Sequence, residues 1–257
     1  SAEGDSDTEG IVQSVEELVN RDDIDAIAVD NINDTILYDV VAKANERGIP
    51  MAFNDIPFAS DETHQIVTNV VNDNYGAGVA IAEQCAEDLG GKGNIILFTH
   101  EGNSAVQPRT QGIHDTLEKY PDINILYEGL LTLNIADATS AMEDLLAHSD
   151  IDAVLSIVDN QTIGNLAAMK AMGREGIKLY SIDGSADICP LIKNGDVEMS
   201  VAQDFVSMGT QTVEALYSYM NGEEVEQTIN CEAPIINADN VDEWIEYFDG
   251  LSFDFAK

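Results

Sequence analysis

The chain has 257 residues, of which 44% are hydrophobic and 23% are charged, so it can bury a large core in one long or two medium domains. It carries 48 acidic against 11 basic residues, which gives a formal net charge of −37. Nucleic acids and anionic membranes are bound through clustered Lys and Arg, so this composition excludes both as partners.

In chain order, hydrophobic spacing first predicts the elements in front of residue 74. We expect a helix at 11–20, a strand at 24–29, a helix at 35–47, a strand at 49–53 and a strand at 65–71. The chain opens on a polar segment, without the strand–helix–strand unit of about 30 residues that would begin such a sheet. We therefore expect this lobe to lack its first βαβ elements, and we favour truncation over an unusual natural variant as the reason.

Beyond residue 74 the alternation of helices and strands continues to the end of the chain. The elements expected, in order, are a helix at 75–89, a strand at 94–98, a helix at 109–119, a strand at 123–127, a helix at 136–147, a strand at 153–157, a helix at 161–172, a strand at 178–182, a helix at 186–194, a strand at 197–202, a helix at 207–220 and an extended tail with a short helix near 240–247. Short apolar strands that alternate with helices are typical of doubly wound parallel sheets. Because such units recur on both sides of about residue 74, we expect two lobes.

The cysteines, the apolar runs and the acidity narrow the class further. No run of 18 apolar residues could span a membrane, and no signal peptide is visible at the polar start. Cys85, Cys189 and Cys231 lie far apart and form no CxxC pair, so we expect core packing rather than a metal site or a disulfide framework. Two interpretations of the acidity stay open: a solvated shell, as in salt-adapted or exported proteins, and attraction of a cation or a basic partner.

Two motifs invite a ligand-binding interpretation that their context does not support. The segment 90–93 (GGKG) follows a helix and precedes a strand, the reverse of a phosphate-binding loop, so we interpret it as a helix C-cap and turn. Residues from Asp5 to Glu16 fit a calcium-loop pattern, which requires a preceding helix, although Asp5 is nearly the first residue. A flexible acidic loop with an N-cap is the alternative, and calcium binding there stays open. No GxGxxG is present, and we expect no cofactor.

The strands at 49–53 and 178–182 each follow a glycine that ends a helix, and they lead into Asp55 and Asp183. In open α/β sheets the carboxyl ends of the strands face the ligand crevice. Two such carboxylates, one from each lobe, predict a cleft for a small polyhydroxylated ligand. A glycosidase also uses two facing carboxylates, but nothing in the sequence marks either as a buried acid, and the GxSxG elbow of serine hydrolases is absent. We therefore expect a binding protein rather than an enzyme.

Arg109 and Gln203 are further candidates for contact with a ligand. Arg109 is one of only four arginines, and its planar fork can hold two hydroxyls or a carboxylate; an exposed helix Arg paired with a nearby Glu is the alternative. Gln203 ends a strand where the chain would cross between lobes, and its amide can donate to and accept from a sugar hydroxyl. Phe53 and Phe205 lie near these polar groups and could stack on a sugar, with core packing as the alternative.

Together these residues resemble the periplasmic sugar-binding proteins of the ribose-binding type, a type I periplasmic binding protein fold shared with the effector domains of repressors related to the lactose repressor. The resemblance runs from about residue 11 to the end of the chain. It is carried by Gly48-Ile49-Pro50 with Asp55, Asn72-Asp73-Asn74, Arg109-Thr110-Gln111-Gly112, the segment 153–159, Ser181-Ile182-Asp183-Gly184, Gln203 and Asn240-Val241-Asp242-Glu243-Trp244.

The resemblance implies an α/β fold of two doubly wound parallel-sheet lobes, joined by three hinge crossings, with the ligand cleft between them. We expect residues 1–72 and 204–230 to form the N-terminal lobe, 73–203 to form the C-terminal lobe, and 231–257 to be a tail that returns across the hinge. The family's first strand and the ligand contacts that follow it have no counterpart here.

The resemblance also implies ligand contacts at the positions that match the family pattern. These are Phe53, Asp55, Arg109, Asn134, Asp159, Asp183 and Gln203, while Asn72 would lie at the first hinge crossing. The chain departs from the pattern at Val158-Asp159, where the family usually has Asn-Asp. One hydrogen-bond partner is therefore lost, and the ligand need not be ribose.

The function we expect is that of an extracytoplasmic receptor for a sugar importer. A monomer in the periplasm, or lipid-anchored on the cell surface, would close on a sugar or polyol and present it to an ABC permease. The alternative is the effector domain of a transcriptional repressor or membrane sensor; an upstream helix-turn-helix would establish it, whereas a signal peptide or lipobox would support the receptor. The negative charge disfavours a DNA-bound neighbour. The sequence does not identify the sugar, because pentoses, hexoses, furanoses and polyols all suit Asp, Arg and Gln.

Overall fold

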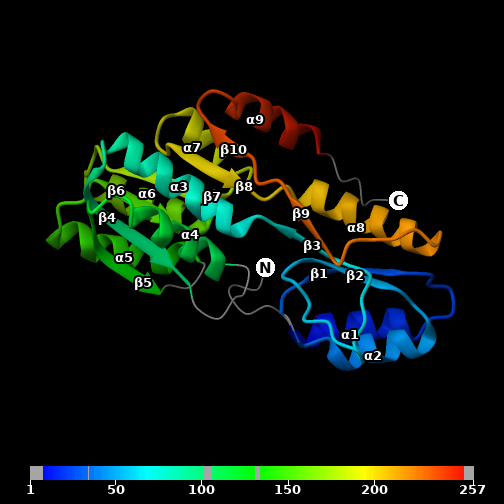
Figure 1. The fold of residues 1–257 in the computed structure, drawn as a ribbon. Helices are drawn as coiled ribbons and strands as arrows, with labels where there is room; N and C mark the ends of the chain where they lie inside the picture. Colours follow the sequence, from blue (N-terminus) through cyan, green and yellow to red (C-terminus); the bar gives the residue numbers. More distant parts are fainter. Residues whose placement is uncertain (1–7, 34, 101–105, 131–133, 252–257) are drawn as a thin grey trace. The chain divides into compact units, whose positions relative to one another are not determined.

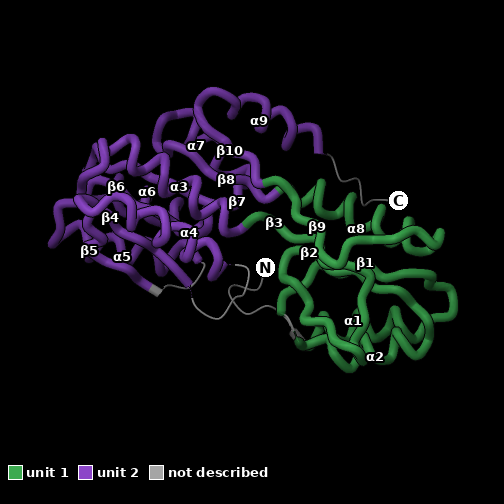
Figure 2. The backbone as a smooth tube through the Cα atoms, in the orientation of Figure 1, with its two compact units in different colours: residues 1–73, 103–105, 204–232 green, residues 74–102, 106–203, 233–257 purple. Residues whose placement is uncertain are grey.

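The computed structural model describes residues 8–33, 35–100, 106–130 and 134–251, which form two compact units (Figure 2). Within these described residues, unit 1 comprises 1–73 with 204–232, and unit 2 comprises 74–102, 106–203 and 233–257. The expected tail, residues 231–257, is for the most part built into unit 2, because it contributes a strand and a helix to the sheet and core of that unit.

Unit 1 is a four-stranded parallel sheet covered by helices on both faces (Figure 1). Its strands, in the spatial order β1-β2-β3-β9, are β1 (Ile27–Asn31), β2 (Met51–Asp55), β3 (Asn69–Asn72) and β9 (Thr228–Cys231). Its helices are α1 (Thr8–Val19), α2 (Tyr38–Arg47) and α8 (Phe205–Met220). β1 and β2 pair so that Asn31 lies opposite Asp55, at the carboxyl ends of both strands.

Successive side chains of β2 point to opposite faces of the sheet, and each face packs against different helices. Met51 and Phe53 belong to the core formed with α1 and α2, whereas Ala52 belongs to a smaller cluster with Leu216 of α8. Successive side chains of a strand point to opposite faces, and a strand with helices on both sides is therefore apolar throughout. This is why the segment 49–53 could be recognised as a strand although its hydrophobicity does not alternate.

Unit 2 is a six-stranded sheet with the spatial order β10-β8-β7-β6-β4-β5, in which β10 is antiparallel to β8 and the other neighbours are parallel. Its strands are β4 (Lys92–Thr99), β5 (Asp122–Leu130), β6 (Ala153–Ser156), β7 (Lys178–Asp183), β8 (Met199–Ala202) and β10 (Ile235–Asn237). Its helices are α3 (Asn74–Asp88), α4 (Gln107–Leu117), α5 (Ile135–His148), α6 (Asp159–Ala171), α7 (Cys189–Lys193) and α9 (Val241–Gly250).

The central strand β4 divides the interior of unit 2 into two cores. Ile95 and Leu97 pack against α3 and α4 on one face of the sheet. Ile96 and Phe98 pack on the other face, against α5, α6, α7 and α9. The carboxyl ends of the parallel strands are therefore flanked by helices from both layers, which is where polar side chains can be gathered over the sheet.

Several elements have other bounds than those expected, among them β1, expected at 24–29, and β3, expected at 65–71. The helix expected at 186–194 is only the five-residue α7, with Pro190 in its first turn, where the missing N–H is tolerated. The strand expected at 123–127 extends over 122–130, because it pairs with the whole of β4. The tail contains the short strands β9 and β10 as well as the expected helix, which is α9.

The structure confirms the core role predicted for the three cysteines and the helix C-cap and turn predicted at 90–93. Cys85, Cys189 and Cys231 are free and buried in hydrophobic clusters. Gly90 and Gly91 follow the end of α3 with left-handed φ values of 64° and 77°, as a helix C-cap and turn requires.

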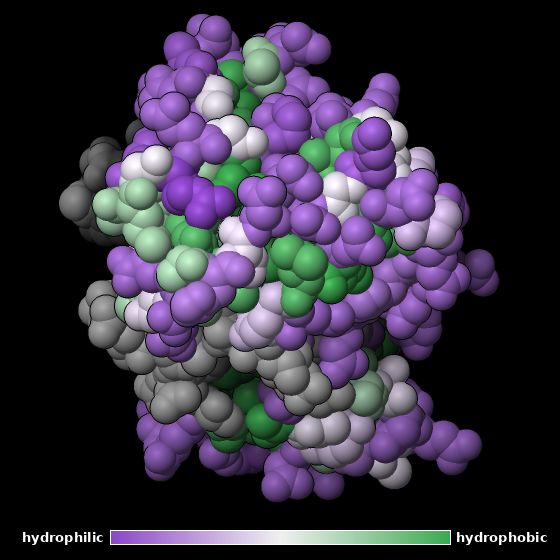
Figure 3. All heavy atoms as spheres, turned by 90° about the vertical axis from the view of Figure 1, so that its left-hand side faces the viewer, coloured by the Kyte–Doolittle hydropathy of each residue, from purple (hydrophilic) through white to green (hydrophobic). Residues whose placement is uncertain are grey.

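Within the described segments, no helix is both long and apolar enough to cross a membrane. Hydrophilic side chains cover most of the face seen in Figure 3, with apolar ones scattered between them. Asp5 and Asp7 of the calcium-loop pattern lie outside the described residues, and among those described no group of three or more His, Cys, Asp or Glu could hold a metal ion.

Candidate functional site

A charged cluster in unit 2 is centred on Arg109 of α4, whose side chain is only 2% exposed. Its Nη1 atom donates to Oδ1 of Asp183 at 2.9 Å and to the carbonyl of Ile157 at 2.7 Å. Its Nε atom donates to Oδ1 of Asn74 at 2.8 Å. Gln203 donates through Nε2 to the same Asp183 oxygen at 2.6 Å. Arg109 is thus a buried cation held by several elements, and the exposed helix pair considered from the sequence does not apply.

Two glycines let α3 and α4 approach closely enough to place Arg109. A Cβ atom on Gly78 would collide with the backbone carbonyl of Arg109, and a Cβ atom on Gly112 would collide with the carbonyl of Tyr75. Glycine, which has no side chain, is the residue that permits such an approach of two backbones. The backbone of Arg109 is therefore fixed against α3, the helix that also supplies Asn74.

The two aspartates predicted from the strand ends both have an unusual backbone conformation. Asp183 ends β7 with a φ of 127°, and Asp55 ends β2 with a φ of 66°. Such values are uncommon for residues that carry a side chain; each costs about 1–3 kcal/mol and persists only where the surroundings hold it. Strained residues of this kind gather at binding sites, and the side chain of Asp183 is 26% exposed, so a ligand can reach it.

Asp159, at the start of α6, is a second carboxylate in this part of unit 2, and unlike Asp183 it is buried. Its Oδ1 atom accepts the hydroxyl of Ser181 at 2.6 Å and that of Ser200 at 2.8 Å. Its Oδ2 atom accepts the N–H of Ser185 at 2.7 Å. With a side chain 2% exposed and both oxygens engaged by the protein, Asp159 is not placed as the direct ligand contact predicted for it. It supports the chain around Asp183 instead.

Burial raises the pKa of Asp159 to about 6, and the neighbouring negative charge of Asp183 contributes in the same direction. The hydrogen bonds from Ser181 and Ser185 act against this rise, because they favour the ionised form. Nothing in the residue pattern marked a buried acid. The structure supplies one, at Asp159 rather than at either of the two strand-end aspartates.

Polar residues also gather at the carboxyl end of the sheet in unit 1. Asn31, opposite Asp55, is 1% exposed and donates through Nδ2 to the carbonyl of Ile56 at 2.8 Å. Asn72, at the end of β3, is buried and donates to the sulfur of Met208 at 3.0 Å. Sequence reasoning found Asp55 and Asn72 but missed Asn31, because the expected strand ended at residue 29 and left the last two residues of β1 unassigned.

Phe53, Phe205 and Asn134 have different places in the structure. Phe53 is fully buried in the core of unit 1 and stacks on Phe58 with ring centroids 4.7 Å apart, so the core-packing alternative applies. Phe205, the first residue of α8, is 52% exposed. Asn134 is the N-cap of α5, and its Oδ1 accepts the N–H of Asp137 at 2.9 Å. That capping bond explains Asn134 without a ligand.

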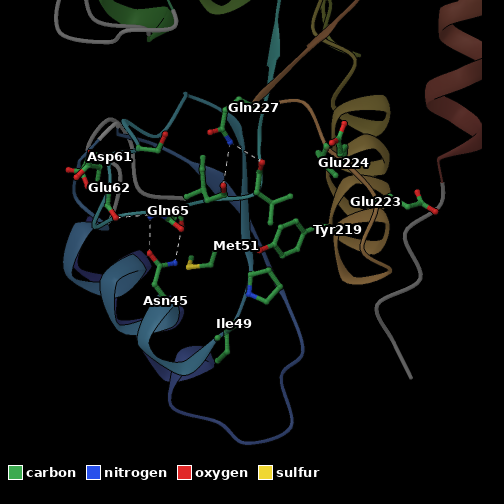
Figure 4. Close-up of a pocket in the computed structure, with 16 residues that line it drawn as sticks. Asn45, Ile49, Met51, Asp61, Glu62, Gln65, Tyr219, Glu223, Glu224 and Gln227 are labelled. Atoms are coloured by element: carbon green, nitrogen blue, oxygen red, sulfur yellow. Dashed lines mark hydrogen bonds between the residues drawn. The ribbon is translucent and has the colours of Figure 1, made fainter.

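A separate hollow of about 830 Å³ lies in unit 1 at the amino end of β2, the opposite end from Asp55 (Figure 4). Ile49, Met51 and Tyr219 contribute apolar surface to it. Its lining includes four carboxylates, and no Lys, Arg or His is among the described residues that line it. The carboxylates are those of Asp61, Glu62, Glu223 and Glu224. This hollow contains none of the predicted ligand-binding residues.

Of the predicted site residues, the structure therefore brings Arg109, Asp183 and Gln203 into direct contact, with Asp159 beside them. Sequence reasoning missed the supporting polar residues, above all Asn74 and the serines of β7 and β8. The segment Asn72-Asp73-Asn74 is part of the resemblance to the sugar-binding family, but its spacing from Arg109 does not predict that Asn74 and Arg109 meet.

Comparison with known proteins gives a consistent family. Over residues 2–224 the chain matches the model of a family described as a periplasmic binding protein domain. It is 33% identical over 254 residues to a xylitol-binding protein of Mycolicibacterium smegmatis, covering 96% of this chain and 70% of that protein. It is 28% identical to a D-apiose import binding protein of Paraburkholderia graminis, covering 80% of this chain and 67% of the relative.

Solved structures agree with this match. An ABC transporter solute binding protein from Bacillus halodurans, with bound myo-inositol, is 26% identical, with a TM-score of 0.82 over 93% of this chain and 83% of that one. A periplasmic solute binding protein from Actinobacillus succinogenes, with bound D-allose, is 22% identical and has a TM-score of 0.85 over 92% of this chain and 86% of that one. The predicted α/β class with parallel sheets is confirmed.

Proposed function

Since the chain belongs to the periplasmic binding protein family, we propose that it is a solute-binding protein that captures a small sugar or polyol and delivers it to an ABC importer. The family is one of binding proteins, and the relatives named above are binding proteins for xylitol and for D-apiose import. We include in the proposal that the protein works outside the cytoplasm as a monomer, and that it releases its ligand chemically unchanged.

The observation that carries this proposal is the contact of Arg109 and Gln203 with Asp183. The partly exposed carboxylate of Asp183 can accept hydrogen bonds from hydroxyl groups. The guanidinium group of Arg109, which already donates to Asp183, Ile157 and Asn74, is also of a chemical type that can donate to a hydroxyl oxygen of a ligand. A group of fixed donors and acceptors in a poorly hydrated place suits a polyhydroxylated molecule.

The charges of the cluster narrow the range of ligand classes that it suits. The positive charge of Arg109 is opposed by Asp183 directly and by Asp159 nearby, so the cluster holds no excess positive charge for an anion. Because the charges of Arg109 and Asp183 compensate each other, the cluster does not need a charged ligand to compensate them. We therefore infer a neutral sugar or polyol rather than a sugar acid or sugar phosphate, with Arg109, Asp183 and Gln203 of unit 2 among its contacts.

A thermal-unfolding screen tests the proposal. The panel contains xylitol, D-apiose, D-ribose, D-allose and myo-inositol, with glucuronate and ribose 5-phosphate as anionic comparisons. A ligand at a hundredfold excess over its dissociation constant stabilises the folded state by about 2.7 kcal/mol. We expect at least one neutral member to raise the melting temperature and neither anion to do so. A protein that melts sharply and responds to no neutral sugar or polyol would refute the proposal, and so would consumption of the sugar, seen in its NMR spectrum.

A matched pair of variants then tests the site. Arg109→Lys keeps the charge but loses the planar fork, so we expect at least a tenfold loss of affinity by calorimetry. Arg174→Lys is the control, because the bonds that Arg174 makes to described residues go to the backbone carbonyls of Leu146 and Ser149. Its affinity should equal that of the native protein. Equal affinities of all three proteins would remove Arg109 from the site.

A further inference from the structure

The loop after β7 is held by hydrogen bonds that meet at Asp159. The Oδ2 atom of Asp159 accepts the N–H of Ser185 at 2.7 Å, and Oδ1 accepts the hydroxyl of Ser200 at 2.8 Å. The oxygen of that Ser200 hydroxyl accepts the N–H of Gly184 at 3.0 Å. The two peptide N–H groups that follow Asp183 in the chain are therefore both fixed by Asp159, one directly and one through Ser200.

The same carboxylate also holds β7 and the start of α6 together. Ser181 donates to Oδ1 of Asp159 at 2.6 Å, and its own oxygen accepts the hydroxyl of Thr162 at 2.8 Å. The backbone N–H of Asp159 donates to Oδ2 of Asp183 at 3.3 Å. In every bond that reaches it, the Asp159 carboxylate is the acceptor, so the arrangement is built for the ionised form.

The backbone of Asp183 explains why such support is needed. Its φ of 127° is followed by a left-handed Gly184 at 63°, and strained residues persist only where the surroundings over-determine their conformation. The register of the sheet puts Ser181 opposite Ser200, so two neighbouring strands offer their hydroxyls to one acceptor. Removing that acceptor frees the chain on the C-terminal side of the residue that binds Arg109 and Gln203.

We propose that Asp159 is a positioning residue: its ionised carboxylate holds Asp183 in the ligand-binding conformation, and protonation of Asp159 weakens that hold and lowers the affinity for the sugar or polyol. This inference rests on the proposed function and adds to it a dependence of ligand affinity on pH. Asp159 acts through Asp183 rather than by touching the ligand.

The groups around Asp159 define the pH range of the effect. Burial and the charge of Asp183 raise the pKa of Asp159 to about 6, so its charge is lost between roughly pH 7 and pH 5. Arg109 faces Asp183 from α4. Cys189 of α7 stays a neutral thiol there, because burial raises its pKa to about 11. His100 follows β4 at the same edge of the sheet, so a variant at this position serves as a control.

Calorimetry from pH 5 to pH 8 tests the inference, with the panel member that binds at pH 7.5 as the probe and xylitol tried first. If only the ionised form binds, about one molecule in ten is competent at pH 5, so the affinity of the native protein falls about tenfold. Asp159→Asn should bind weakly and without this pH dependence. Ser200→Ala keeps the carboxylate but removes one bond to its ionised form, which should move the midpoint to higher pH. His100→Asn is the control and should show the native profile.

A second measurement does not depend on any ligand. Hydrogen exchange of the Ser185 amide, corrected for its intrinsic rate, should show protection that falls as pH is lowered through 6 in the native protein. A constant affinity of the native protein from pH 5 to pH 8, or a pH dependence retained in Asp159→Asn, would overturn the role of Asp159. If no panel member binds at pH 7.5, the proposed function fails. In that case the hydrogen exchange of the Ser185 amide still tests the role of Asp159. Protection that does not change with pH would show that Asp159 does not hold this loop, and protection that falls as pH is lowered through 6 would support it.

Discussion

Replacing Arg109 by Met removes the buried charge at the centre of the site while keeping an unbranched side chain. Arg109→Met removes a donor from three acceptors: the carbonyl of Ile157, Oδ1 of Asn74, and Oδ1 of Asp183, which keeps only the neutral donor of Gln203. Removing one partner of a buried ion pair costs about 3–5 kcal/mol. We expect about 3 kcal/mol here, because the Asp183 side chain is 26% exposed and water can reach the stranded charge.

The double variant Arg109→Met/Asp183→Asn separates the stranded charge from the lost packing. It removes the uncompensated carboxylate, so it should recover about 1–2 kcal/mol of the loss. Asn also tolerates the left-handed backbone of position 183 at least as well as Asp does. The free energy of unfolding is measured in urea at pH 7.5, and hydrogen exchange of amides in unit 2 separates local loss from any change in unit 1.

Arg174→Met is the matched control for this measurement. It removes hydrogen bonds to two backbone carbonyls and strands no charge, so about 1 kcal/mol is expected. The reasoning would be refuted if Arg109→Met cost no more than Arg174→Met. It would also be refuted if the added Asp183→Asn change lowered stability further, because the charge of Asp183 would then not be the source of the penalty.

Three further predictions concern residues whose structural roles are now defined. Phe53→Ala should destabilise the protein by about 3–5 kcal/mol, because its ring packs on Phe58 in the core; calorimetry should give an unchanged affinity, and a weaker one would restore ligand stacking. Asn134→Ala should cost about 1 kcal/mol in urea unfolding through the lost bond to the Asp137 N–H. A loss of affinity without a loss of stability would make it a ligand contact. The pKa of Asp159 in the folded state, about 6, exceeds the unfolded value, so its ionisation opposes folding. The stability of the native protein relative to Asp159→Asn should therefore be highest below about pH 4, fall as pH rises to 6 and then level off; a difference that is constant across this range would contradict the buried carboxylate.

The positions of Asp55, Asp183 and Gln203 could be predicted because each ends or directly follows an apolar strand in an alternating α/β pattern. The partner of Arg109 could not be predicted in this way. Asp183 lies 74 residues further along the chain, and neither helical spacing nor charge pairing along α4 points to it. The resemblance to a family implied a shared site, and only the folded chain shows the bond between the two residues.

The support around Asp159 escaped prediction for a different reason. Ser181 and Ser200 look like ordinary small residues within apolar strands, and it is the pairing of β7 with β8 that sets their hydroxyls side by side. The core position of Phe53 depends likewise on Phe58, which lies outside regular secondary structure, in the segment between β2 and β3. Contacts that arise from strand register or from irregular loops leave no local pattern in a sequence.

The close contact of α3 and α4 limits how this protein could be redesigned for another ligand. Gly78 and Gly112 leave no room for a side chain, and the backbone of Arg109 lies against one of them. A library of variants at Gly78 and Gly112 would yield mostly misfolded proteins, whatever the target sugar. Val158, the N-cap of α6 next to Asp159, is also buried in the core that packs against α3 and α4, so replacements there would have to keep a similar size.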